Sequence, residues 1–140
     1  MDFKLELVLI PVADVDRAKK FYLENAGFQL LVDTPIADGK RIVQITPPGS
    51  ACSVGFGTGV TDAEPGSAQG LHLVVADIEV GRRLLTMRGV EVSEIRHVGG
   101  EGWQPGAHPD RADYSSFADF ADPDGNIWIL QEVGHNTSEV

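Results

Sequence analysis

An internal repeat is the feature that most constrains the fold of this chain. Three short segments of the first half recur in the second half with similar chemistry and in the same order. The pairs are VADVD at 12–16 with VADIE at 75–79, GFQL at 27–30 with GVEV at 89–92, and TPPGS at 46–50 with DPDGN at 122–126. Three ordered matches indicate two copies of one structural unit.

Each copy predicts the element order βαβββ. An apolar run leads to Asp14 in the first copy and to Asp77 in the second, and aspartate is a favoured N-cap of a helix. Apolar residues at helical spacing follow, and Gly27 and Gly89 stand where helices commonly end. The remaining strands are expected at 28–33, 40–46 and 51–57, and again at 90–95, 117–121 and 126–131.

These elements predict an α+β protein with a single domain over residues 1–140. Its two tandem βαβββ modules are expected at about 4–57 and 70–133, joined by a Gly/Ser/Pro-rich linker at 58–69. Two half-open sheets can pack edge to edge around a shared concave face. The expected result is a cup-shaped mixed sheet with the helices outside.

Composition excludes several classes of partner. The net charge of −10 argues against nucleic acid, whose phosphates need clustered Lys and Arg, and against an anionic membrane surface. Cys52 is the single cysteine, so no internal disulfide can form. The first residues lack the pattern of a signal peptide, and no apolar run approaches the ~20 residues of a membrane span. A cytoplasmic protein is expected.

Three stretches together resemble the vicinal oxygen chelate superfamily. They are LVLIPVADVDRAKKFY at 7–22, LHLVVADIE at 71–79 and FADPDGNIWILQE at 120–132. That superfamily includes glyoxalase I, extradiol dioxygenases, and fosfomycin and bleomycin resistance proteins. The resemblance covers about residues 4–132, and it implies paired βαβββ modules, a cup-shaped sheet and often a homodimer. It implies no particular reaction, because the superfamily spans lyases, oxygenases, transferases and proteins that sequester ligands.

The resemblance also implies four positions at which members that use a metal place its ligands. In this sequence they are Leu7, Ser53, Gly70 and Ile129. None offers the imidazole, carboxylate or thiolate that a divalent metal needs. We therefore expect no metal and no other cofactor.

Shifting the alignment does not restore a ligand set. A shift of one residue back gives Glu6 and Cys52, whose side chains would point to the opposite sheet face. A shift of two residues forward gives His72 as one good ligand, with the weak amide of Gln131. Glu132 is the nearest carboxylate on the last strand, but it alternates with Ile129 and so is expected on the other face.

His72 and Gln131 are the candidate polar residues of the cup. His72 lies two positions after Gly70, and Gln131 lies two positions after Ile129, so on a strand each pair shares one face of the sheet. Together they could hydrogen-bond a ligand, or His72 could act as a general base. The alternative is a histidine whose hydrogen bonds are satisfied by backbone or water.

Trp103 is the candidate aromatic contact. It lies in a Gly-rich stretch at 96–114 that is expected to be a long loop, acting as a lid over the cup, as a contact with a neighbouring subunit, or as plain surface packing. His97 and His108 of this loop are expected to be solvated, and Cys52 to be a small buried hydrophobe. The rings expected in the core are Phe21, Tyr22, Phe56, Phe117, Phe120 and Trp128.

The function expected from these residues is metal-independent binding, or sequestration, of a small organic molecule with a flat or apolar part, neutral or cationic. The ligand-contact candidates are His72, Gln131, Trp103, Leu7, Ser53, Gly70 and Ile129. Two alternatives stay open. One is a lyase, isomerase or dioxygenase with a displaced metal site or with His72 as its acid–base residue. The other is a regulatory or assembly module whose cup is filled by its own side chains.

Overall fold

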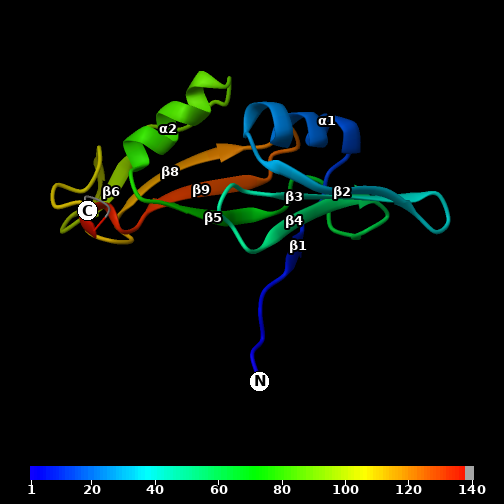
Figure 1. The fold of residues 1–140 in the computed structure, drawn as a ribbon. Helices are drawn as coiled ribbons and strands as arrows, with labels where there is room; N and C mark the ends of the chain where they lie inside the picture. The colour runs from blue at the N-terminus through cyan, green and yellow to red at the C-terminus, as the bar shows by residue number, and fades with distance from the viewer. Residues whose placement is uncertain (138–140) are drawn as a thin grey trace. The chain divides into compact units, whose positions relative to one another are not determined.

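A computed structural model of the chain describes residues 1–137 (Figure 1). The chain divides into two compact units. Unit one comprises Met1–Gln69 together with Asp122–Asn126, and unit two comprises Gly70–Ala121 together with the residues from Ile127 onward. Each unit has its own sheet, and two α-helices lie within the described residues. The α+β class expected from the sequence is confirmed.

Unit one is a four-stranded mixed sheet with one helix on one face (Figure 1). Its strands run in the order β1-β4-β3-β2; β1 is parallel to β4, and the other pairs are antiparallel. Its elements are β1 (Leu7–Leu9), α1 (Val15–Lys20), a π-helical turn (Phe21–Asn25), β2 (Gln29–Ile36), β3 (Lys40–Thr46) and β4 (Ser53–Thr58).

The local signals read from the sequence set the ends of these elements. The Asp14 side chain accepts a hydrogen bond from the Arg17 N–H at 3.0 Å and so caps α1. Asp38 and Gly39 both have positive φ, 65° and 73°, where the chain turns from β2 into β3. The core between α1 and the sheet consists of fully buried residues: Ile10, Ala18, Tyr22, Val43, Ile45 and Phe56.

The turn at 122–126 is part of unit one. The Asp122 carboxylate accepts a hydrogen bond from the Tyr22 hydroxyl at 2.7 Å. The Asn126 side chain donates to the Pro11 carbonyl at 2.8 Å and accepts from the Ala68 N–H at 3.0 Å. Asp124 accepts from the side chain of Arg17 at 2.9 Å. The conspicuous DPDGN motif therefore holds the backbone of unit one together.

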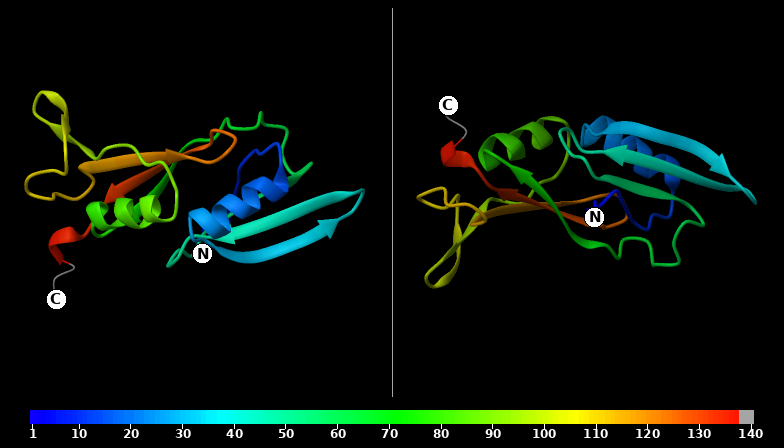
Figure 2. Two further views of the ribbon diagram at one scale, coloured as in Figure 1. Left: turned by 90° about the horizontal axis from the view of Figure 1, so that it is seen from above. Right: turned by 60° about the horizontal axis from the view of Figure 1, so that its bottom comes forward.

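Unit two is a five-stranded sheet in the order β5-β9-β8-β6-β7, with α2 against one face (Figure 2). Its elements are β5 (Gln69–Val75), α2 (Ile78–Met87), β6 (Arg96–Gly99), β7 (Gly102–Pro105), β8 (Ser116–Ala121), β9 (Ile127–Glu132) and a short 3-10 turn (His135–Thr137).

The helix of unit two begins as expected. The Asp77 side chain accepts hydrogen bonds from the N–H groups of Glu79 and Val80. The buried face of the sheet carries Phe120 and Trp128, whose rings stack with centroids 6.1 Å apart and planes 5° from parallel. Bulky residues on alternate positions of β8 and β9 thus form the core beneath α2.

Two expectations about the second module are wrong. Residues 90–95 form no strand. The Ser93 hydroxyl, rather than a backbone carbonyl, accepts from the Asp119 N–H at 2.9 Å, and Arg82 of α2 donates to the carbonyls of Val92 and Ser93. Side-chain hydrogen bonds thus replace part of the ladder, although the Ser93 N–H still donates to the Asp119 carbonyl at 2.8 Å. β6 begins only at Arg96.

The stretch at 96–114 is not a long loop throughout. Residues 96–105 form the β6–β7 hairpin, with Val98 opposite Trp103. Trp103 therefore lies on a strand of the sheet. None of the helical segments in residues 1–137 has the length and hydropathy that crossing a bilayer requires.

Candidate functional site

The sheet of unit two has one face that α2 does not cover. We call this the open face, and it carries every second residue of the strands. Register and ring contacts place the following side chains and one glycine on it: Gly70, His72, Arg96, Trp103, Phe117, Asp119, Ile129 and Gln131. Five of these, Gly70, His72, Trp103, Ile129 and Gln131, are ligand-contact residues expected from the sequence.

An aromatic pair dominates one end of the open face. The rings of Trp103 and Phe117 meet edge to face, with centroids 5.4 Å apart and planes at 84°. The Arg96 guanidinium lies 5.0 Å from the centre of the Trp103 ring, within cation–π range. Trp103 nevertheless stays 57% exposed. Its neighbours hold the indole in place while much of its surface remains available to a ligand.

Polar groups flank this aromatic pair. Arg96 also forms an ion pair with Asp119 at 3.6 Å, so its charge is partly balanced. Gln131 stands directly opposite Phe117 in the β8–β9 ladder, and Ile129 stands opposite Asp119. An amide, a cation and a carboxylate thus surround an aromatic surface, as in sites that orient a small ligand by a few hydrogen bonds.

His72 presents one ring nitrogen for recognition. Its Nδ1 lies 2.7 Å from the Gly70 carbonyl oxygen. A carbonyl only accepts hydrogen bonds, so Nδ1 carries the proton, and in the neutral ring Nε2 is the acceptor. The side chain is exposed. His72 can therefore accept a hydrogen bond from a ligand.

Gly70 leaves a gap beside His72 and Ile129. A Cβ at this position would lie 3.8 Å from the Ile129 Cδ1 and 3.9 Å from the His72 Cε1, which is ordinary contact. The obstacle to a larger residue is the backbone, because φ is +98° and side chains other than hydrogen are strained there.

Leu7 and Ser53, the two expected contact residues of the first module, are partners on β1 and β4 of unit one. The Leu7 Cδ1 lies 3.2 Å from the position that a Gly55 Cβ would take, and Leu9 and Ile42 border the same position. Ser53 is buried, and its hydroxyl shares a hydrogen bond with that of Thr46 at 2.8 Å. This face of unit one is therefore mainly aliphatic.

The residues present do not fit the metal centre that the resemblance implies. Of the four ligand positions, only Ser53 carries a donor atom, and its hydroxyl is already paired with Thr46. Across residues 1–137, no group of three or more His, Cys, Asp and Glu side chains is arranged to hold a metal ion. No catalytic step can be assigned to a metal at these positions.

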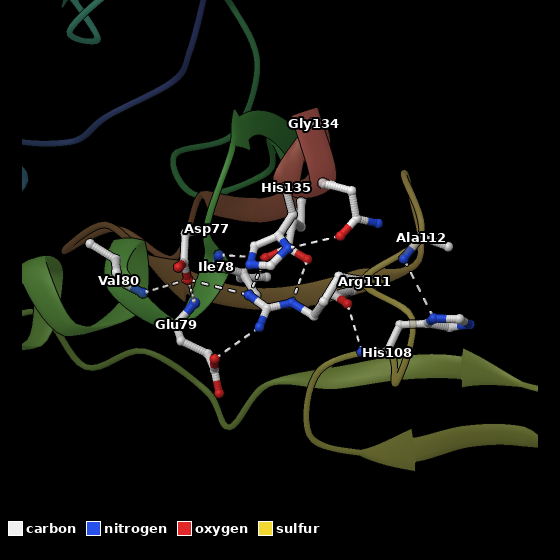
Figure 3. A network of polar contacts seen from close by, with 12 residues as sticks. Asp77, Ile78, Glu79, Val80, His108, Arg111, Ala112, Gly134 and His135 are labelled. Atoms are coloured by element: carbon white, nitrogen blue, oxygen red, sulfur yellow. Dashed lines mark hydrogen bonds and ion pairs between the residues drawn. The ribbon is translucent and has the colours of Figure 1, made fainter. Parts of the chain in front are cut away.

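Glu132 faces α2, as its parity predicts, and it is fully buried. It accepts hydrogen bonds from the Ile78 N–H at 2.8 Å and from the Arg111 Nε at 2.8 Å. Arg111 also pairs with Asp77 and Glu79 at the start of α2 (Figure 3). The Glu132 carboxylate is therefore part of a structural cluster with Arg111, Asp77 and Glu79.

The cluster shifts the pKa values of its members. Burial raises the pKa of Glu132, but the hydrogen bonds from Arg111 and Ile78 outweigh it, so the pKa lies below its ordinary value. The hydrogen bond to Glu132 raises the pKa of Arg111. Asp77 also has a lowered pKa, first because the Val80 N–H donates to its carboxylate. All three groups are thus charged at neutral pH.

A separate cleft of about 220 Å³ lies within unit one. It is bordered by Pro11–Ala13, Val15, Gly57–Gly59 and part of the segment from Thr61 to Pro65. Its lining contains no titratable side chain, so it offers hydroxyl and backbone groups but no acid–base chemistry.

Sequence reasoning missed three members of the open face: Arg96, Phe117 and Asp119. Phe117 was expected in the core, and that expectation is wrong, because Phe117 alternates with the buried Ala118 and Phe120. Pairing β8 with β9 across the turn would have placed Phe117 beside Gln131. Of the other expected core rings, Tyr22, Phe56, Phe120 and Trp128 are buried, whereas Phe21 is half-buried.

The expectations for His97 and Cys52 also need correction. His97 is 9% exposed rather than solvated, because its Nδ1 pairs with the Gly106 carbonyl oxygen at 2.8 Å and its ring meets that of His108. His108 is half-buried, and its Nδ1 accepts from the Asp110 N–H at 3.1 Å. Cys52 is half-buried.

The fold and the repeat define the class of the protein. Residues 4–130 match the family model of the Glyoxalase/Bleomycin resistance protein/Dioxygenase superfamily. The chain belongs to this superfamily. The search of curated proteins found no match.

Solved structures from bacteria resemble the chain over nearly its whole length. TnmS3, an antibiotic binding protein from Streptomyces sp. CB03234, is 33% identical, with a TM-score of 0.73 over 94% of this chain and 96% of that chain. A glyoxalase/bleomycin resistance protein from the same organism is 34% identical, with a TM-score of 0.70 over 91% and 99%. A superfamily member from Sphaerobacter thermophilus DSM 20745 is 27% identical, with a TM-score of 0.73 over 94% and 98%.

Proposed function

We propose that this chain binds a small organic molecule on the open face of unit two, without a metal, and sequesters it. The observation that carries the proposal is the exposed Trp103, held between Phe117 and Arg96. The similarity to an antibiotic binding protein supports a ligand of that general kind. In unit one, considered by itself, the face around Leu7 and Ser53 offers aliphatic surface to an apolar group.

The chemistry of the open face favours a flat molecule that is neutral or cationic. A planar ring system can stack on the exposed surface of Trp103, and a cation can bind over an aromatic ring. The net charge of −10 disfavours a strongly anionic ligand at long range. Hydrogen bonds from Gln131 and to the His72 Nε2 would orient the molecule.

An enzyme of the lyase, isomerase or dioxygenase type is the second candidate. His72 supports it, because this exposed ring offers an acceptor nitrogen to a bound substrate. Analysis of the ligand after incubation separates the two functions: sequestration returns it unchanged, whereas catalysis converts it. The superfamily resemblance further favours a homodimer, which we include in the proposal.

The binding proposal predicts a measurable role for Trp103. In a thermal-shift screen of planar neutral and cationic compounds, binders should raise the melting temperature by mass action. For such a binder, Trp103→Ala should weaken affinity about tenfold, because one aromatic contact contributes roughly 1–1.5 kcal/mol. Isothermal titration calorimetry measures both affinities, because Trp103→Ala removes the indole whose fluorescence would report binding.

Met87→Ala is the matched control for this experiment. Met87 is 75% exposed on α2, away from the open face, so its loss should leave affinity unchanged. Equal affinity of Trp103→Ala and the unmodified protein would contradict the assignment of the site. A screen without any binder would contradict the proposed function itself.

Metal independence is tested by elemental analysis. Protein purified without a polyhistidine tag should contain far less than one zinc, nickel, manganese or iron per chain. Three of the four implied ligand positions lack a donor atom, and the Ser53 hydroxyl is already paired with Thr46. Treatment with a chelator should leave ligand affinity unchanged. One metal per chain that is lost on His72→Ala would overturn this part of the proposal.

A further inference from the structure

The cleft of unit one lies where two parallel strands separate. β1 and β4 run parallel, and the last pair of their register is Leu9 with Gly55. The chain then leaves the sheet through Pro11 toward α1, whereas β4 continues to Thr58. Beyond Gly55, no strand within residues 1–137 pairs with this edge of β4, and the cleft opens here. In α/β folds, ligands commonly bind in such crevices beyond the carboxyl ends of parallel strands.

Gly57 presents its backbone to this unpaired edge. The Ser53 N–H donates to the Glu6 carbonyl at 2.9 Å, and the Gly55 carbonyl accepts from the Ile10 N–H at 2.8 Å. Alternate residues of a strand turn their backbone groups to the same edge, so the N–H and C=O of Gly57 also face this side. Within residues 1–137, the structure gives these two groups no hydrogen-bond partner on that edge. Gly57 borders the cleft and has no side chain to cover them, so they are open to a ligand.

Hydrogen bonds fix the segments on both sides of this edge. The Pro11 carbonyl accepts from the Gly66 N–H at 3.2 Å and from the Asn126 side chain at 2.8 Å. In the linker, the Thr61 hydroxyl accepts from the Ala63 N–H at 3.2 Å. Both segments border the cleft. A ligand therefore meets walls that are already in place, and it does not have to order them at a cost in affinity.

The lining of the cleft defines the chemistry of a ligand. Pro11, Val12, Val15 and Pro65 contribute apolar surface, and none of the described residues that line the cleft carries a titratable side chain. A charged ligand would find no counter-charge there, so a neutral one is favoured. The volume of about 220 Å³ equals that of about seven waters at about 30 Å³ each, which suits a molecule of roughly ten non-hydrogen atoms.

We propose that this cleft is a second ligand site, which takes a small neutral molecule carrying a primary carboxamide or a lactam. Such a group has a C=O and an N–H on one edge. Its C=O accepts from the Gly57 N–H while its N–H donates to the Gly57 carbonyl, as a paired strand residue does. The apolar remainder of the molecule packs against Pro11, Val12 and Val15. This site is independent of the ligand on the open face, because all of its residues belong to unit one.

Benzamide and two analogues of the same size test the paired hydrogen bonds. Benzamide should bind the full chain with a Kd of about 1–10 mM, as expected for so small a ligand, and should shift the amide resonance of Gly57 in two-dimensional NMR spectra. Acetophenone keeps the carbonyl but has a methyl group in place of the NH₂, and benzoate has a charged oxygen there. Both should bind at least about tenfold more weakly, because neither can donate to the Gly57 carbonyl.

Ala63→Trp tests the location of the site. Ala63 borders the cleft and is exposed, so a large side chain there should obstruct the cleft without disturbing the core of unit one. Benzamide should bind this variant at least about tenfold more weakly, because the indole occupies space that the ligand needs. Ala37→Trp is the matched control: Ala37 is exposed in the turn between β2 and β3, outside the cleft, and its replacement should leave the affinity unchanged.

Several outcomes would overturn the second site. Equal affinities for benzamide and acetophenone would show that the Gly57 carbonyl takes no part in binding. Resonance shifts centred on the Trp103 indole instead of Gly57 would place benzamide on the open face. No binding of benzamide in the millimolar range, or binding that Ala63→Trp leaves unchanged, would show that the cleft is not the site. A failure of this kind leaves the ligand proposed for the open face untouched, because that proposal depends on Trp103.

Discussion

Arg111→Met is expected to lower the free energy of unfolding by about 3 kcal/mol at neutral pH. Glu132 is fully buried, and Arg111 is the cation that compensates its charge at 2.8 Å. Removing that cation leaves a buried carboxylate that still accepts a hydrogen bond from the Ile78 N–H but has lost its ion pair with Arg111. Denaturant unfolding measures the loss.

Two further variants isolate the cause of this loss. Arg83→Met replaces an exposed arginine on α2 and should change stability by less than about 0.5 kcal/mol. Adding Glu132→Gln to Arg111→Met removes the uncompensated charge, so the double variant should be more stable than Arg111→Met alone. If the double variant is no more stable, packing of the arginine rather than charge compensation explains the loss.

The same variant has a predictable pH dependence. In the native protein the pKa of Glu132 lies below its ordinary value of 4.5, so the carboxylate contributes stability above that pH and loses it as pH falls. Without Arg111, burial raises the pKa of Glu132. The variant then gains stability relative to the native protein as pH falls from 7 toward 4.5. A difference that is constant over this range would contradict the charge argument.

The main features of the fold could be predicted from the sequence because they depend on local chemistry. The aspartate caps at Asp14 and Asp77, the Asp38-Gly39 turn and the alternation of β8 and β9 each act over a few residues, and the repeat relates them across the chain. The side-chain hydrogen bonds that replace backbone hydrogen bonds between strands could not be predicted from the sequence. The Ser93 hydroxyl that replaces a carbonyl in the ladder to Asp119 looks like an ordinary strand residue in the sequence.

The candidate site, too, was predictable where it depends on local alternation and unpredictable where it depends on contacts between distant strands. The superfamily resemblance implied Gly70 and Ile129, and the alternation of side chains along a strand then placed His72 and Gln131 on the same face, because alternation is a local property. The contact of Trp103 with Arg96 depends on the β6–β7 hairpin. The glycines of this segment favoured the prediction of a loop instead. A site built across three strands therefore became visible only when the register was known.

Asn126→Ala is the second change from which we expect a large effect. Asn126 is fully buried, and its amide bridges backbone groups far apart in the sequence, the Pro11 carbonyl and the Ala68 N–H. It also donates to the Asp122 carboxylate at 2.8 Å. Alanine would leave two buried groups and the part-buried Ala68 N–H without that partner, and each buried group that loses its partner costs about 1–3 kcal/mol.

We therefore expect Asn126→Ala to lower the free energy of unfolding by roughly 3 kcal/mol, less than the sum because water can reach part of the turn. Asn136→Ala is the control: its amide also donates to a carbonyl, that of Asp110, but at an exposed site. It should cost less than about 0.5 kcal/mol. Equal effects of the two substitutions would show that the DPDGN turn is no more than a connection between β8 and β9. A large difference would explain why so polar a motif stands in the buried part of unit one.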